Sequence, residues 1–136
     1  MSGPAPVAIT TPALPAGPTE RFAYSYAVRQ GRDLFVSGLV PFDPEGRIVG
    51  LNDPEAQAEQ VFANLAAIMA AAQGSVDDVV ETTTYCIDRN HLLAINEARV
   101  RCFTGSVKPT STLLVVAGLA RPEFLVEISA RAVLPS

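Results

Sequence analysis

Apolar side chains recur with helical spacing between residues 54 and 72. The face they form consists of Ala58, Val61, Phe62, Leu65, Ile68, Met69 and Ala72, at i, i+3, i+4, i+7 intervals. Asp53 suits the cap of this helix, Pro54 suits its first position, and Gly74 is a natural stop. A second amphipathic helix is expected from about His91 to Thr104.

Alternating and β-branched segments predict the strands. Residues 22–28 and 33–39 are expected to form a hairpin, and further strands are expected at 79–87, 112–116 and 125–133. The resulting order β-β-α-β-α-β-β predicts an α+β fold, with a mixed sheet and two helices on one face. The other face needs cover, which a small domain often finds in copies of itself. Residues 1–18 are rich in proline and predict an extended arm, so the domain itself is expected at 19–136.

Composition narrows the classes of function. Of the 136 residues, 10 are Lys or Arg and 14 are Asp or Glu, for a net charge of −4, which argues against nucleic acid as a partner. No segment approaches the length of a membrane span, so we expect no membrane partner and a cytoplasmic location. Cys86 and Cys102 have neither metal-ligand nor redox spacing, and His91 is the only histidine. We therefore expect no metal site.

Six segments, in order and at near-matching spacing, resemble the signature blocks of the reactive-intermediate deaminase (Rid/YjgF) family. They are 24–28 (YSYAV), 34–38 (LFVSG), 57–65, 77–83 (DDVVETT), 95–97 (INE) and 125–128 (LVEI). Each block alone is weak, but together they span most of the chain. The resemblance implies a chorismate-mutase-like fold, a homotrimer, and clefts between subunits where enamines or imines are hydrolysed without metal or organic cofactor.

The resemblance also assigns candidate site residues. Glu127 matches the late glutamate of the family and is the candidate catalytic residue, because a carboxylate can hold and deprotonate the attacking water. The candidate substrate-binding residues carried over from the family are Tyr24, Ser37, Gly38 and Asn96.

One position departs from the family pattern. Where the family commonly has an arginine that binds the substrate carboxylate, this chain has Thr110, followed by Ser111. Both hydroxyls remain candidate substrate ligands, but a neutral hydroxyl cannot replace a bidentate guanidinium. The usual short 2-imino acids are therefore not the expected substrates. The arginines that are candidates to replace the missing one are Arg89, Arg99, Arg121 and Arg131.

Two functions from different classes fit this sequence. The first is an enamine or imine hydrolase with Glu127 as the proton-transfer group, and the alternative is a trimeric small-molecule binding or regulatory protein without turnover. Taken without the resemblance, Glu127 is interpreted as a solvated strand residue paired with Arg131. An apolar pocket around Glu127 would favour the enzyme, whereas pairing with Arg131 would favour the alternative. The ribonuclease activity ascribed to some family members is disfavoured by the acidic charge balance.

Overall fold

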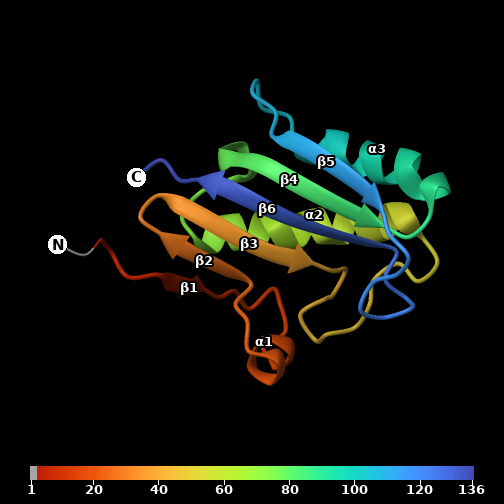
Figure 1. The fold of residues 1–136 in the computed structure, drawn as a ribbon, viewed down its shortest axis with the longest axis horizontal. Helices are drawn as coiled ribbons and strands as arrows, with labels where there is room; N and C mark the ends of the chain where they lie inside the picture. The colour runs from red at the N-terminus through yellow and green to blue at the C-terminus, as the bar shows by residue number, and fades with distance from the viewer. Residues whose placement is uncertain (1–2) are drawn as a thin grey trace.

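A six-stranded mixed sheet with its two longer helices on one side dominates the computed structural model, which describes residues 3–136 (Figure 1). The strands lie in the order β1-β2-β3-β6-β4-β5. Their bounds are β1 Val7–Ile9, β2 Ala27–Gln30, β3 Asp33–Leu39, β4 Val79–Cys86, β5 Thr110–Val115 and β6 Val126–Val133. The helices are α1 Gly17–Phe22, α2 Pro54–Ala71 and α3 Leu92–Cys102, with short 3-10 turns at Val76–Asp78 and Arg89–His91.

Helix α2 begins where the sequence predicts. The Asp53 side chain accepts a hydrogen bond from the Ala56 backbone N–H at 3.0 Å, and Pro54 occupies the first turn. The expected apolar face is buried, with Val61, Leu65 and Ile68 at most 1% exposed. Figure 1 shows α2 and α3 together behind the sheet, so the core lies between the helices and one sheet face.

The sheet combines both strand directions, as predicted. β4 and β5 run parallel, and every other neighbouring pair is antiparallel. In the part of the chain that the structure describes, β5 pairs only with β4 and forms an edge of the sheet. Among residues 3–136, no helix is long and apolar enough to cross a bilayer.

The first predicted strand was wrong at its start. Phe22 ends α1, Ala23 adopts a left-handed conformation with φ 57°, and β2 begins only at Ala27. Pro18 lies in the first turn of α1, where the backbone N–H that proline lacks would have no partner within the helix. Tyr24 and Tyr26 therefore lie in the connection before β2, although both fall within the strand expected over 22–28.

The segment expected as an arm contributes to the sheet. Val7–Ile9 forms β1 against β2, with Ala8 opposite Val28, and residues 17 and 18 are helical where extended chain was expected. Met1 and Ser2, the first residues of that arm, lie outside the described residues. The division of the chain at residue 18 stays a prediction.

Candidate active site

Glu127 lies on the sheet face that α2 and α3 leave uncovered. In β6 its neighbours Val126 and Ile128 are at most 1% exposed and point into the core, so strand alternation directs Glu127 to the opposite face. Across from it, β3 has a register shift between Val36 and Leu39. Such bulges bend a strand and redirect side chains, often next to functional sites.

Gly38 lies in this bulge and makes room for the carboxylate. A Cβ on Gly38 would overlap the Glu127 carboxylate oxygen and lie 2.7 Å from its Cδ. Since real Cβ atoms do not approach so closely, only glycine fits here without moving Glu127. Gly38 was predicted to be a substrate-binding residue. In the structure it lies beside Glu127, and its lack of a side chain leaves the space that the carboxylate occupies.

The Glu127 carboxylate forms no ion pair with any of residues 3–136. Among residues 3–136 no basic group lies within 4.0 Å of it, and Arg131, the partner considered from sequence, lies 3.7 Å from Asp33 and stacks on Phe35. Burial raises the pKa of Glu127 above its usual value of 4.5, because desolvation disfavours the charged form. The interpretation of Glu127 as a salt-bridged strand residue was wrong.

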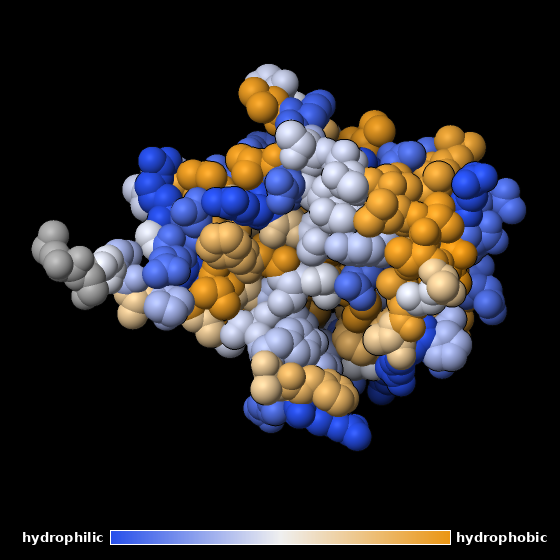
Figure 2. All heavy atoms as spheres, viewed as in Figure 1, coloured by the Kyte–Doolittle hydropathy of each residue, from blue (hydrophilic) through white to orange (hydrophobic). Residues whose placement is uncertain are grey.

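A cavity of about 570 Å³ surrounds the carboxylate; we call it the Glu127 pocket. Its apolar lining comes from α1, β3 and the loops after β3 and β5, and consists of Pro18, Phe22, Gly38, Val40, Phe42, Ala120 and Phe124. The polar lining is limited to Arg21, Tyr24, Arg121 and Glu127. In Figure 2 this region is a hollow between α1, at the bottom of the view, and the segment after β5. A mostly apolar cavity with a few convergent polar groups is the usual form of a small-molecule site.

Tyr24 reaches the pocket because α1 ends just before it. The left-handed Ala23 turns the chain, and Tyr24 packs edge-on against Tyr26 with ring centroids 5.8 Å apart. The Tyr26 hydroxyl donates to the Pro15 carbonyl at 2.6 Å and is held there. Burial raises the pKa of Tyr24, and the nearby charge of Glu127 raises it further. Tyr24 therefore stays a neutral hydroxyl beside the carboxylate.

Ser37 has a structural role next to Gly38. Its hydroxyl donates a hydrogen bond to the Ser25 backbone carbonyl at 2.6 Å, and its backbone N–H donates one to the Tyr26 backbone carbonyl at 2.9 Å. These bonds attach β3 to the chain before β2, and Ser37 does not line the pocket. Ser37 thus fixes the bulge and the Tyr24 segment relative to one another.

Asn96, Thr110 and Ser111 do not join the Glu127 pocket within one chain. Asn96 is exposed on α3, on the other side of the sheet. Thr110 is the first residue of β5, and its hydroxyl donates a hydrogen bond to the Val80 carbonyl at 3.2 Å. Across β4, Thr110 is in register with Arg131 of β6, two strands away. Arg131 lies four residues along β6 from Glu127, so Thr110 and Glu127 are roughly 16 Å apart by strand geometry. Glu127 and Thr110 can meet at one site only between two copies of the chain.

The four candidate arginines are separated by the structure. Arg99 donates to the Thr82 hydroxyl at 2.6 Å from the helix side, Arg131 lies beside Asp33, and Arg89 is exposed on a 3-10 turn. Arg121 alone of the four lines the Glu127 pocket. Its guanidinium carbon lies 5.7 Å from the Phe124 ring centre and 5.9 Å from that of Phe42.

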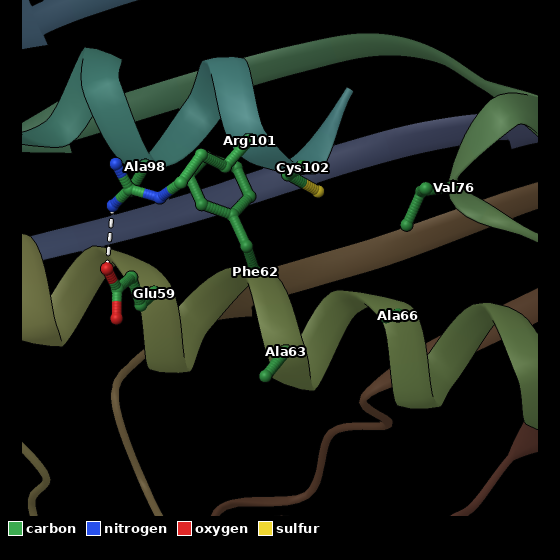
Figure 3. A pocket seen from close by; sticks show the side chains of 8 residues that line it. All are labelled: Glu59, Phe62, Ala63, Ala66, Val76, Ala98, Arg101 and Cys102. Carbon is green, nitrogen blue, oxygen red and sulfur yellow. Dashed lines mark hydrogen bonds and ion pairs between the residues drawn. The ribbon is translucent and has the colours of Figure 1, made fainter. Parts of the chain in front are cut away.

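A second hollow, between α2 and α3, lacks catalytic groups (Figure 3). At one end Arg101 donates to Glu59 at 2.6 Å, so both charges are already paired. Phe62 and several alanines form its wall. Burial raises the pKa of the Cys102 thiol to about 11, which keeps it protonated and unreactive. Within residues 3–136 no cluster of His, Cys, Asp and Glu has the arrangement of a metal site.

Residues 15–134, nearly the whole chain, match the family model described as Endoribonuclease L-PSP. A RutC family protein of Pyrococcus horikoshii is 36% identical over 116 residues, covering 85% of this chain and 86% of that protein. The chain belongs to the Rid/YjgF family.

Solved structures of this family have the same fold. A member of the conserved Rid protein family from Yersinia pestis superposes with a TM-score of 0.85 at 31% identity, over 96% of this chain and 100% of that one. TdcF of E. coli, solved with bound serine, gives a TM-score of 0.82 at 32% identity, over 93% and 98%. The predicted α+β chorismate-mutase-like fold is therefore confirmed.

The sequence missed most of the pocket wall. Arg21 and Phe22 belong to α1, which buries none of its six residues and so has no apolar stripe to reveal it. Phe42 and Phe124 come from two separate loops and meet edge-on, with ring centres 5.5 Å apart. The aromatic residues in these two loops were the available signal. Because the loops are far apart in the sequence, no local pattern indicated that they meet in the fold.

Proposed function

We propose that this protein hydrolyses an imine or enamine in the Glu127 pocket. The observation that carries the proposal is a carboxylate of raised pKa, without a counter-charge among residues 3–136, in a mostly apolar cavity. A general acid-base group works best when its pKa approaches the operating pH, and desolvation shifts Glu127 in that direction. A site that only binds a neutral or anionic ligand has no need of an unpaired, desolvated carboxylate.

The proposed reaction needs one proton acceptor that later becomes a donor. The Glu127 carboxylate takes a proton from water as the water oxygen bonds to the imine carbon, and it passes that proton to the imine nitrogen, giving the neutral carbinolamine R₂C(OH)NH₂. Glu127 then takes the hydroxyl proton and delivers it to nitrogen as the C=O bond forms and the C–N bond breaks, so that R₂C=NH and H₂O become R₂C=O and NH₃. An enamine enters the same path after protonation at carbon. Tyr24, neutral and adjacent, donates a hydrogen bond to the developing hydroxyl or to the water.

A homotrimer with a site completed by the neighbouring copy is part of this proposal. The sheet face without helices exposes Phe35 and Leu114 to 46% and 44%, and β5 leaves one edge unpaired. Figure 2 shows apolar side chains gathered over the end of β5 and the segment after it. Exposed apolar patches and strand edges favour self-association. A neighbour packed there would bring its Thr110 or Asn96 toward the Glu127 pocket, which a single chain does not do.

The assay for the proposed reaction uses imines made in place. An amine oxidase converts primary amines with apolar bodies to R–CH=NH, and the loss of imine and release of ammonia are followed with and without the protein. Glu127→Gln should lower the acceleration by about 100-fold or more, the usual contribution of an acid-base group. Glu97→Gln, an exposed glutamate on α3, is the matched control and should change little. No acceleration of any imine in such a panel, or equal rates for Glu127→Gln, would refute the proposal.

The assembly is tested separately. Sedimentation of the wild type should give three chains per particle, and Leu114→Asp should shift the protein toward monomers because it places a charge in the proposed contact. A stable wild-type monomer at micromolar concentration would remove both the trimer and the interfacial site.

A further inference from the structure

Within the described part of the chain, the two arginines of the Glu127 pocket have no acidic partner. Arg21 comes from α1 and Arg121 from the loop between β5 and β6. Among residues 3–136, neither guanidinium lies within 4.0 Å of a carboxylate or donates a side-chain hydrogen bond, whereas Arg101 and Arg131 are paired with acids. The two groups thus keep their N–H donors available to a ligand.

Aromatic rings support both guanidinium groups. Arg121 lies over the Phe42 and Phe124 rings, and Arg21 lies 5.2 Å from the centre of the Phe22 ring. Stacking on an aromatic face orients a guanidinium and leaves its edge, which carries the donors, open to solvent. Such an edge matches the planar oxygens of a carboxylate.

The charge at the pocket is opposite to that of the molecule. The chain has a net charge of −4, yet two of the four polar residues lining the Glu127 pocket are arginines on facing walls. A positive rim on an acidic protein attracts anions locally. Both arginines are exposed, whereas Glu127 is partly buried on the sheet, so the positive charge lies at the mouth and the carboxylate on the floor.

Resting on the proposed function, we infer that the substrate carries an anionic group at the far end of an apolar body. Arg121, assisted by Arg21, binds that group at the mouth, the aromatic walls contact the body, and the C=N group reaches Glu127. The volume of about 570 Å³ lies in the range of pockets for drug-sized ligands and exceeds the needs of a three-carbon molecule. This arrangement also keeps the ligand's negative charge away from Glu127, which would otherwise repel it.

The test measures binding of two unreactive probes, 3-phenylpropanoate and its neutral amide 3-phenylpropanamide, by calorimetry on the intact protein. Wild type should bind the carboxylate at least ~10-fold tighter than the amide, and added salt should weaken only the carboxylate. Arg121→Gln should remove most of this preference, and Arg21→Gln a smaller part. Arg89→Gln, an exposed arginine away from the pocket, is the matched control and should leave it unchanged.

Glu127→Gln separates this inference from the proposed function. Removing the floor carboxylate should lower turnover by about 100-fold or more but preserve or strengthen binding of the anionic probe. Wild-type turnover in Glu127→Gln, together with arginine-dependent binding, would overturn the proposed function and leave the anion site standing. Equal affinity for both probes, no detectable binding of either, or an unchanged preference in Arg121→Gln would overturn the anion site, whatever the turnover.

Discussion

The two ends of the sheet's uncovered face differ in what a single chain can build. At the Glu127 end, a bulge in β3, helix α1 and two loops enclose a pocket around an unpaired carboxylate. At the Thr110 end, an edge strand begins with exposed hydroxyl residues, and the Thr110 hydroxyl is satisfied by the Val80 carbonyl. The enclosing pocket removes water from the Glu127 carboxylate and supplies no partner for it, and this raises its pKa. The open end around Thr110 has no comparable effect on its hydroxyl.

The largest expected effect contrasts Glu127 with Thr110 directly. Glu127→Gln should reduce imine hydrolysis by about 100-fold or more, whereas Thr110→Val should reduce it by only about threefold, the loss of at most one neutral hydrogen bond. Rates are measured as ammonia release at saturating protein for both variants. A larger loss in Thr110→Val than in Glu127→Gln would reverse our assignment of the two ends.

Gly38→Ala tests whether the bulge places the carboxylate. The added methyl group overlaps the end of the Glu127 side chain, and since that end is flexible, Glu127 will move and the fold will remain. Displacement of a catalytic group by about 1 Å should lower turnover by about 10- to 100-fold. Gly118→Ala is the matched control, because a Cβ there meets nothing within 4 Å. If Gly38→Ala is as active as Gly118→Ala, the close approach of Gly38 to Glu127 does not serve catalysis.

Residues whose role depends on strand alternation or a helix cap were predictable, and those whose role depends on distant packing were not. Asp53, Pro54 and the apolar face of α2 specify that helix locally, and alternation in β6 directs Glu127 away from the core. By contrast, β1 exists only through its pairing with β2, and α1 has no buried face. Three of the pocket-lining residues come from α1 and most of the others from connecting loops, so the candidate Glu127 was found and its surroundings were not.

Arg121 is a second example of a residue whose role depends on distant packing and so could not be predicted from the sequence. The sequence put it among four arginines of equal standing, because a charge in a loop has no pattern to fix its direction. Its position follows from the contact between Phe42 and Phe124, which come from loops 82 positions apart in the chain. Only the folded chain separates Arg121 from Arg89, Arg99 and Arg131.

The raised pKa of Glu127 predicts a dependence of stability on pH. The folded state holds the Glu127 proton more tightly than the unfolded state, so this residue lowers stability as pH rises from the ordinary value of 4.5 through the raised pKa. Relative to wild type, Glu127→Gln should therefore become more stable across this window and stay so above it. Urea unfolding at fixed protein concentration over a pH series measures the difference. Glu97→Gln should show no such trend, and a flat difference for Glu127→Gln would contradict the desolvation of its carboxylate.

The smallest expected effect concerns short 2-imino acids. Their carboxylate is bonded to the imine carbon, so a C=N group at Glu127 places that charge on the pocket floor, where desolvation is costly and no guanidinium lies beside it. Thr110 supplies at most one neutral hydrogen bond, even if a neighbouring copy brings it to the pocket, and a three-carbon molecule is too short to reach Arg121 at the mouth. We therefore expect the wild type to accelerate ammonia release from dehydratase-generated imines of serine or threonine little or not at all. The measurement is the decay of the imine signal with and without the protein. Robust acceleration would show that an arginine does reach a carboxylate at the floor, and the two ends of the sheet would then not differ as proposed.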